Sequence, residues 1–247
     1  LVSLEKDPGT AWSLGTNYFK MVATDPDFSS TTEASGMAPA TVATGARGAA
    51  LFAYAGDLQG NVWRFDLSTG SSDWTSASGK VSRMFLARSA AGVKQAITVA
   101  PIVTHSQSKG YQIAFGTGKF LEPSDALPGS AAYQSMYGIW DAMDGKTFQR
   151  QPTGAGSSYV NGLNTRTISV TTGTVTSSIS VTGPDFFYGT SSSRYRGWFA
   201  DFSGNMERVS VDPAYESAVL AINSTIPGGD PCLANGASNQ YRINLHW

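Results

Sequence analysis

Side-chain oxygens recur at every second position of the segment Asp25-Pro-Asp-Phe-Ser-Ser-Thr-Thr-Glu33. This spacing is typical of loops that coordinate a hard cation such as Ca²⁺. The segment has no glycine for the sharp turn of such a loop, and Pro26 restrains the chain near its start. We therefore interpret it as a solvated surface loop of Ser, Thr and acidic residues, with cation binding as the alternative.

Three aspartates at repeated positions could be read as catalytic carboxylates. The segment Asp-Leu-Gln-Gly-Asn-Val-Trp-Arg-Phe, which begins at Asp57, recurs from Asp201 as Asp-Phe-Ser-Gly-Asn-Met-Glu-Arg-Val, and a looser copy surrounds Asp141. An aspartate at the start of a turn accepts a hydrogen bond from the backbone two residues on, and the glycine supplies the positive φ that closes a hairpin. We predict that all three cap turns, and we assign no catalytic, cofactor-binding or metal-binding residue.

Other reactive residue types are sparse. His105 and His246 are far apart in the sequence, and no cluster of His, Cys and acidic residues has metal-ligand spacing. The Gly-Thr-Gly-Lys segment that ends at Lys119 lacks the spacing of a phosphate-binding loop, and no Gly-x-Ser-x-Gly motif supports a hydrolase. The single cysteine, Cys232, excludes an internal disulfide. It is either a free thiol in a loop or a half-cystine whose partner lies elsewhere in a longer protein.

The elements that must position these side chains are short β-branched and aromatic runs bounded by Gly, Asn, Asp or Pro. We predict strands at residues 50–55, 61–67, 82–87, 111–116 and 167–170, and one short helix at residues 213–218. The repeated Asp-x-x-Gly unit cannot bury its own apolar face, so copies must stack on one another as the blades of a β-propeller do. At about 40–50 residues per blade, the chain supplies about five blades.

We expect residues 1–247 to form a single all-β domain, or the larger part of one as a fragment of a longer protein. Two regions are interpreted as surface insertions. Residues 24–40 are rich in Ser, Thr, Pro and acidic residues, and residues 154–183 alternate Thr or Ser with Val or Ile around Thr172-Gly173, which predicts a hairpin.

Composition excludes two classes of partner. Charged residues make up 14% of the chain, against about 25% in an average soluble domain. The net charge is −1 and the Lys and Arg residues are scattered, so the basic stripe of a nucleic-acid-binding protein is missing. No apolar run approaches the roughly 18 residues that a membrane-spanning helix requires, so we expect no membrane insertion.

Several segments in series resemble the PilC/PilY family, in an order and spacing that match over roughly residues 35–244. They are Tyr-Ala-Gly-Asp-Leu-Gln-Gly-Asn-Val-Trp-Arg-Phe-Asp-Leu (54–67), Ile-Thr-Val-Ala-Pro-Ile-Val (97–103), Phe-Gly-Thr-Gly-Lys-Phe-Leu-Glu (115–122) with Asp125, Gln-Ser-Met-Tyr-Gly-Ile-Trp-Asp (134–141), Gly-Trp-Phe-Ala-Asp (197–201), Arg-Val (208–209) and Ile-Pro-Gly-Gly-Asp-Pro-Cys (226–232). The resemblance implies a modified quinoprotein-like β-propeller with irregular loop and hairpin insertions.

The same resemblance implies a non-enzymatic function associated with type IV pili, in pilus assembly, retraction control and surface adhesion. It implies export through the periplasm to the pilus tip, the outer membrane or the cell surface. The implied partners are pilin and minor pilins, a host or abiotic surface, and the remaining N-terminal part of the same protein.

Members of the family often carry a calcium loop just before the Tyr-Ala-Gly-Asp strand. In this chain its ligand positions fall on Ala43, Gly45, Arg47 and Leu51, and none of them is a carboxylate. Ca²⁺ takes about six or more oxygen ligands, and an arginine at the third ligand position would repel it. We therefore expect the family's calcium site to be lost and no other cofactor to be bound.

Two other functions are weighed against adhesion and assembly. A generic propeller that binds a protein or glycan would be favoured by an exposed aromatic cluster on one face. A quinoprotein dehydrogenase is suggested by residues 55–63, which resemble the tryptophan-docking motif of those enzymes, but typical members hold the quinone against a vicinal cysteine pair and a calcium ion. In an adhesin, we expect residues 24–40, 123–132 and 151–165 to carry recognition, because loops on a rigid scaffold collect binding residues.

Overall fold

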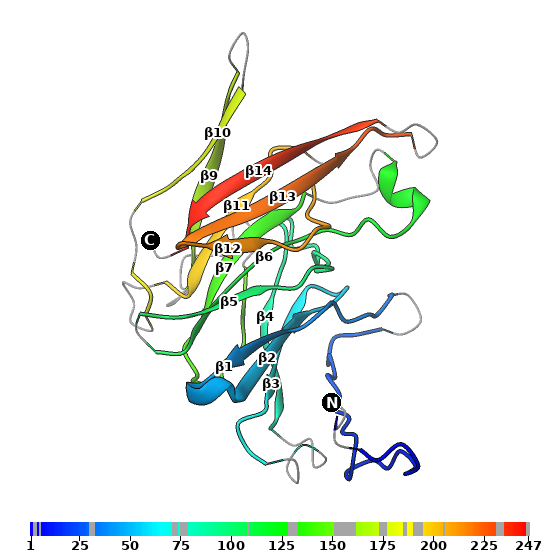
Figure 1. Ribbon diagram of the computed structural model, residues 1–247. Helices are drawn as coiled ribbons and strands as arrows, with labels where there is room; N and C mark the ends of the chain where they lie inside the picture. The colour runs from blue at the N-terminus through cyan, green and yellow to red at the C-terminus, as the bar shows by residue number, and fades with distance from the viewer. Residues whose placement is uncertain are drawn as a thin grey trace.

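The computed structural model describes residues 1, 4, 6–29, 33–70, 74, 79–107, 109–127, 133–150, 162–172, 177–184, 187–189, 195–204, 206–230 and 235–245. The two alternatives for Cys232, the assignment of His246 and most of the predicted recognition segment 151–165 fall outside these residues. Within them the protein is built almost entirely of strands (Figure 1). The two short helical turns are η1 (Ala46–Gly48) and η3 (Pro123–Ala126). No described helix is long and apolar enough to cross a membrane.

The first sheet has the order β1-β2-β3-β4-β8. Its strands are β1 (Thr41–Thr44), β2 (Ala50–Gly56), β3 (Asn61–Asp66), β4 (Val81–Leu86) and β8 (Phe148–Gln149). The pairs from β1 to β4 are antiparallel, whereas β8 joins β4 in parallel. The strands predicted at 50–55, 61–67 and 82–87 are therefore confirmed to within a residue or two.

The second sheet has the order β10-β9-β11-β7-β6-β5. Its strands are β5 (Ile102–His105), β6 (Tyr111–Gly116), β7 (Ser135–Asp141), β9 (Leu163–Thr172), β10 (Ser177–Thr182) and β11 (Gly197–Asp201). The hairpin predicted around residues 172–173 is confirmed, because Thr172 pairs with Ser177 in the antiparallel β9–β10 ladder. This hairpin joins the rest of the second sheet through β9, which runs parallel to β11.

The third sheet consists of β12 (Ala214–Glu216), β13 (Val219–Pro227) and β14 (Gly236–Asn244) in that order. The helix predicted at residues 213–218 is wrong, since residues 214–216 form a strand. Ser217 and Ala218 both take positive φ values of 50° and 67°. Two consecutive residues with positive φ close a tight hairpin, which sends the chain back along β13 and prevents a helix.

In the second sheet, β6 and β7 are buried on both faces, because their side chains alternate between two cores. Ile113, Phe115, Tyr137 and Ile139 point to one side and pack with residues of the first sheet such as Phe85. The alternate residues on the other side pack against the third sheet, in a cluster that contains Ala114, Met136, Trp198, Ala200, Leu220, Ile222, Tyr241 and Ile243. The second sheet is thus the layer that joins the other two (Figure 1).

Two glycines make equivalent close contacts between layers. At the end of β2, Ile97 donates its backbone N–H to the carbonyl of Asp57 (2.9 Å), and a Cβ on Gly56 would collide with the Ile97 side chain. At the end of β6, Val209 donates to the carbonyl of Thr117 (2.9 Å), and a Cβ on Gly116 would collide with Val209. The same arrangement therefore occurs twice: a glycine at the end of a strand packs against a β-branched residue, which donates its backbone N–H to the carbonyl that follows the glycine.

The expected number of about five blades needs correction. The described strands form three sheets of five, six and three strands. The difference arises because β8 and the β9–β10 hairpin add to sheets that already exist and do not start new ones. Residues 24–29 and 33–40 hold no strand and are mostly exposed, as expected of a surface segment.

Candidate functional site

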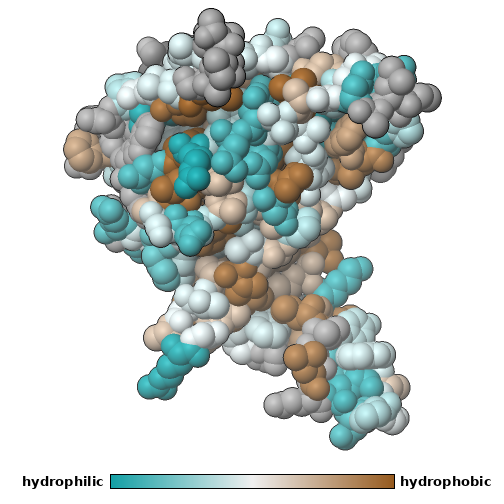
Figure 2. Space-filling model, turned by 45° about the horizontal axis from the view of Figure 1, so that its top comes forward, coloured by the Kyte–Doolittle hydropathy of each residue, from teal (hydrophilic) through white to brown (hydrophobic). Residues whose placement is uncertain are grey.

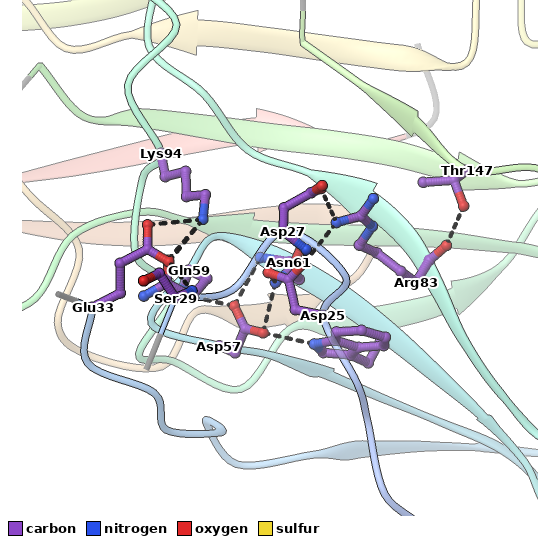
Figure 3. Close-up of polar contacts among 11 residues, drawn as sticks. Asp25, Asp27, Ser29, Glu33, Asp57, Gln59, Asn61, Arg83, Lys94 and Thr147 are labelled. Atoms are coloured by element: carbon purple, nitrogen blue, oxygen red, sulfur yellow. Dashed lines mark hydrogen bonds and ion pairs between the residues drawn. The ribbon is translucent and has the colours of Figure 1, made fainter. Parts of the chain in front are cut away.

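The turn between β2 and β3 is organised by Asp57. Its Oδ1 accepts hydrogen bonds from the backbone N–H groups of Gln59 and Asn61 (2.9 Å each). Its Oδ2 accepts from Asn61 Nδ2 (2.9 Å) and from the indole Nε1 of Trp63 (2.7 Å). Asn61 and Trp63 are buried. The carboxylate therefore caps the turn, as predicted, and in addition holds a buried tryptophan in place (Figure 3).

The acidic segment that begins at Asp25 lies across this turn. Asp25 accepts from Asn61 Nδ2 (2.8 Å) and from Arg83 (2.8 Å), and Asp27 accepts from the same arginine (2.8 Å). Partial burial raises the pKa of Asp25, but the hydrogen bonds from Asn61 and the Asp27 backbone, with the Arg83 charge, outweigh it and leave that pKa below its ordinary value. Ion pairs thus fasten the start of the segment to β4 (Figure 3).

The end of the segment is fastened by a second basic side chain. Lys94 donates to Glu33 (3.0 Å) and to Oε1 of Gln59 (3.0 Å), and Glu33 also accepts the backbone N–H of Ser29 (3.1 Å). The Ser29 hydrogen bond and then the Lys94 ammonium hold the pKa of Glu33 below its usual range. All three described carboxylates of the proposed cation loop, at 25, 27 and 33, therefore face Arg83 or Lys94 (Figure 3).

A cavity of about 320 Å³ opens next to this network. Two of the three segments expected to carry recognition border it, because Ala34 belongs to 24–40 and Asp125 to 123–132. Its full lining is Ala34, Leu58, Gln59, Val93, Lys94, Ala96, Lys119, Leu121, Glu122, Asp125, Gln134 and Arg208. This volume lies at the small end of the range of ligand-binding pockets. We call it the loop-face pocket.

The other two repeated aspartates lie elsewhere. Asp141 accepts the backbone N–H of Met143 (2.9 Å), so it caps its turn as predicted, and it also binds Arg64 (2.9 Å) and the Tyr54 hydroxyl (2.9 Å). Asp201 is used differently. Its carboxylate is paired with the buried Arg150, whose guanidinium also lies over the Phe199 ring. Asp57, Asp141 and Asp201 thus share no hydrogen-bond partner among the described residues.

The two remaining sequence candidates occupy ordinary positions. His105 ends β5 beside the β5–β6 turn and packs against the Tyr111 ring. Lys119 pairs with Asp125 (3.1 Å) and approaches Glu122 (3.6 Å). Among the described residues, no group of three or more His, Cys, Asp or Glu side chains is arranged to hold a metal ion.

The residues at the family's calcium positions do not fit calcium. Ala43 is buried in β1 and Leu51 lies in β2, where an added Cβ on Gly45 would come within 2.7 Å of the Leu51 Cδ1 atom. Arg47, at the tip, has a φ of 65°. The backbone closes this connection directly, since Gly45 N–H donates to the carbonyl of Ala49 (2.8 Å). The aliphatic side chain of Leu51 thus occupies a position where calcium would need an oxygen ligand.

Sequence reasoning missed the basic residues Arg83, Lys94 and Arg208. Arg83 and Lys94 lie 58 and 61 residues from the carboxylates that they meet. Arg208 meets the nearby Met206 carbonyl but also the Lys119 carbonyl 89 residues away, so the sequence gives no local signal of the long-range contacts. The acidic residues at 25, 27 and 33 were the one available signal. They indicate that basic side chains lie nearby, but they do not identify which ones.

Comparisons with known proteins identify related chains. Residues 30–181 match the model of the PilY1 beta-propeller domain. The type IV pilus biogenesis factor PilY1 of Pseudomonas aeruginosa strain PAO1 is 33% identical over 225 residues, which cover 78% of this chain and 19% of that protein. A PilY1 homolog of Xylella fastidiosa is 30% identical over 201 residues, covering 77% and 14% respectively. The chain thus spans about a fifth or less of the length of these relatives.

A solved structure agrees with this assignment. The crystal structure of the Pseudomonas aeruginosa PilY1 C-terminal domain matches with a TM-score of 0.66 and 27% identity, over 89% of this chain and 49% of that chain. The expected all-β, propeller-type fold is thereby confirmed. Because the family model matches more than half of the chain and relatives above 30% identity cover more than three quarters of it, this chain belongs to the PilY1 β-propeller family.

Proposed function

We propose that this chain is part of a type IV pilus-associated protein that acts in pilus assembly, retraction control and adhesion to surfaces, without catalysing a reaction. The relatives named type IV pilus biogenesis factor PilY1 support the pilus association. On this proposal the protein is exported to the pilus tip or cell surface. Its partners are pilin or minor pilins, a host or abiotic surface, and other parts of the same protein.

The observation that carries a recognition role is the loop-face pocket. It is bordered by residues of two segments, 24–40 and 123–132, whose described parts hold no strand. Loops held on a rigid scaffold are where binding residues accumulate. The absence of a catalytic role is proposed because the three repeated aspartates share no described hydrogen-bond partner and each is engaged in local hydrogen bonds or ion pairs.

We also propose that this region functions without calcium. The positions that would supply ligands are an alanine, a glycine, an arginine and a leucine, and the last makes an aliphatic contact toward Gly45. The carboxylates of the acidic segment at 25, 27 and 33 are engaged by Arg83 and Lys94.

The test uses the full-length protein in a bacterium that lacks its own copy. Leu121 and Leu127 are exposed by 64% and 44% on the segment beside the pocket, and Val170 is exposed by 51% on β9. We expect the double variant Leu121→Ser, Leu127→Ser to adhere less than the wild type, and the matched control Val170→Ser to adhere normally. Pili are counted by electron microscopy and attached cells by microscopy on a surface.

A second variant removes residues 1–247 from the full-length protein. We expect it to lose surface pili or adhesion. If cells with this deletion assemble, retract and attach normally, the proposed function is wrong. If only the double leucine variant behaves normally, recognition lies on another face of the molecule.

A further inference from the structure

Five charged side chains line the loop-face pocket, and four of them form ion pairs. Lys94 pairs with Glu33 (3.0 Å). Lys119 pairs with Asp125 (3.1 Å) and lies 3.6 Å from Glu122. Asp125 also accepts the backbone N–H groups of Leu121 (3.0 Å) and Glu122 (3.1 Å). Their charges are therefore largely compensated within the protein.

Arg208 is the exception. It is 1% exposed and its guanidinium bonds only backbone carbonyls among the described residues: Nε donates to Met206 (3.0 Å) and Nη1 to Lys119 (3.0 Å). Its Nη2 atom has no hydrogen-bond partner in the described part of the chain. Asp125 contributes at a distance, without a hydrogen bond to the guanidinium.

A buried cation without a hydrogen-bonded counter-ion is destabilising, and leaving a buried donor unmade adds to that cost. Both deficits are removed if an anion enters the pocket beside the guanidinium. A carboxylate fits this role best, because guanidinium and carboxylate groups match in shape and charge. The lining has three basic and two acidic side chains, an excess of one positive charge that a singly charged carboxylate balances and a doubly charged phosphate exceeds.

We propose that the loop-face pocket binds a carboxylate on a peptide segment of a protein partner, with Arg208 as its anchor. This inference rests on the proposed recognition function and specifies the ligand. The pocket walls are Leu58, Val93 and Leu121, and the last two are exposed by 51% and 64%. An aliphatic side chain next to the carboxylate would cover these walls and remove their apolar surface from water.

The same walls favour a peptide over an acidic sugar. Sugar rings bind by packing their C–H faces on aromatic rings, and the described lining residues include no aromatic side chain. Because Arg208 is almost fully buried, the pocket wall must open for the ligand. Among the charged lining side chains, Glu122 is 64% and Lys119 39% exposed, so a change of rotamer in either loses little buried contact.

The experiment measures peptide binding to the full-length protein by fluorescence anisotropy. The probes are acetyl-Leu-Glu-Leu-amide and acetyl-Leu-Gln-Leu-amide, each carrying the same fluorophore, with glucuronic acid as an unlabelled competitor. We expect the Glu peptide to bind about tenfold more tightly than the Gln peptide, the minimum expected of a hydrogen bond between charged groups. We expect glucuronic acid to compete poorly.

Two variants locate the preference. Arg208→Met removes the anchor and should abolish the difference between the peptides, whereas the matched control Arg242→Met, at an exposed position of β14, should preserve it. Leu121→Asp changes a largely exposed residue, so it should fold even if Arg208→Met does not. It places a negative charge at the rim and should weaken binding of the Glu peptide more than that of the Gln peptide.

Equal affinity of the two peptides for the wild type would overturn the proposal. A preference that survives in folded Arg208→Met, or that is unaffected by Leu121→Asp, would also overturn it, and effective competition by glucuronic acid would assign the pocket to an acidic sugar. If these arms fail while the deletion of residues 1–247 still abolishes piliation or adhesion, the proposed function stands and only the ligand assignment falls.

Discussion

At the scale of single residues, one carboxylate can do several structural tasks at once. Asp57 accepts from two backbone N–H groups and two side chains, and both of those side chains are buried. Asp66 accepts the backbone N–H (2.9 Å) and the hydroxyl (2.5 Å) of Ser68 and lies 3.7 Å from Lys80 Nζ, but it accepts no hydrogen bond from a buried side chain. Comparing the two aspartates measures what the hydrogen bond from Trp63 contributes to the free energy of unfolding.

We expect Asp57→Ala to lower the free energy of unfolding by about 2–4 kcal/mol, because it leaves the buried Trp63 indole N–H without its acceptor and removes the turn cap, while Asn61 Nδ2 keeps its hydrogen bond to Asp25. Asp66→Ala should cost about 1 kcal/mol or less. Urea unfolding followed by tryptophan fluorescence measures both. Equal costs would show that the contact from Trp63 Nε1 to the carboxylate contributes little.

The docking of the acidic segment should depend on pH. The pKa values of Asp25 and Glu33 lie below the ordinary 3.8 and 4.5, so the folded state favours their charged forms. Their contribution to stability is therefore fully present above those ordinary values and is lost as the pH falls through the lowered values. In the double variant Asp25→Asn, Glu33→Gln, we expect a stability deficit at neutral pH that disappears on acidification.

Thermal melting of the wild type and the double variant between neutral and acidic pH measures that stability deficit. Added salt should reduce the deficit, because the ion pair of Glu33 with Lys94 is solvent-accessible. A deficit that is constant from neutral to acid pH would contradict the assignment of these ion pairs.

At the scale of elements, the strands were predictable and their partners were not. The runs at 50–55, 61–67, 82–87 and 111–116 are found as strands because alternation and turn residues are local signals. The pairing of β4 with β8 and of β9 with β11 joins residues far apart in the chain, which no local pattern records. The helix predicted at 213–218 failed because the positive φ of Ser217 and Ala218 is invisible in their identity.

The residues of the candidate site likewise divide into those that the sequence predicts and those that it does not. The acidic positions at 25, 27 and 33 and the recognition segments at 24–40 and 123–132 could be named from composition and spacing. The basic residues that meet them could not, because Arg83 and Lys94 contact carboxylates 58 and 61 residues away and Arg208 contacts the Lys119 carbonyl 89 residues away.

The glycine contacts between layers make a prediction for this scale. A Cβ on Gly116 would collide with Val209, which is fully buried, so we expect Gly116→Ala to destabilise the protein by about 1–3 kcal/mol through overpacking. Gly9 has open space around its Cβ position, and Gly9→Ala is the matched control with an expected change near zero. Denaturant midpoints measure both, and a neutral Gly116→Ala would mean that the two layers are not in close contact there.

At the scale of the whole molecule, the second sheet connects the other two. One of its faces contributes Phe115 and Tyr137 to the core shared with the first sheet, and the other contributes Met136 and Trp198 to the core shared with the third. On the face shown in Figure 2, hydrophobic residues of the described chain lie in small groups between hydrophilic ones. The apolar surface of the layers is thus largely used in their mutual packing.

We therefore expect one cooperative thermal transition, seen at the same temperature by circular dichroism and by tryptophan fluorescence. We expect the transition of this region to be unchanged when a calcium chelator is added, because its loop at 43–51 carries none of the required carboxylates. Two separate transitions would show that the layers unfold independently. A melting temperature that falls with chelator would show that calcium is bound despite the altered positions.

The two parallel pairings have a consequence for the order in which the chain acquires its structure. Hairpins such as β2–β3 and β13–β14 close short loops, whereas Phe85 meets Phe148 and Gly197 meets Leu163 only after long stretches of chain have been brought together. Long-range pairing is slow because the chain loses entropy on closing a long loop before the stabilising contacts form. During refolding, pulse-labelled amides of β8 should therefore gain protection last, whereas amides of β9 can be protected earlier through its hairpin with β10. Until β8 pairs, the edge of β4 stays open to pairing with other chains.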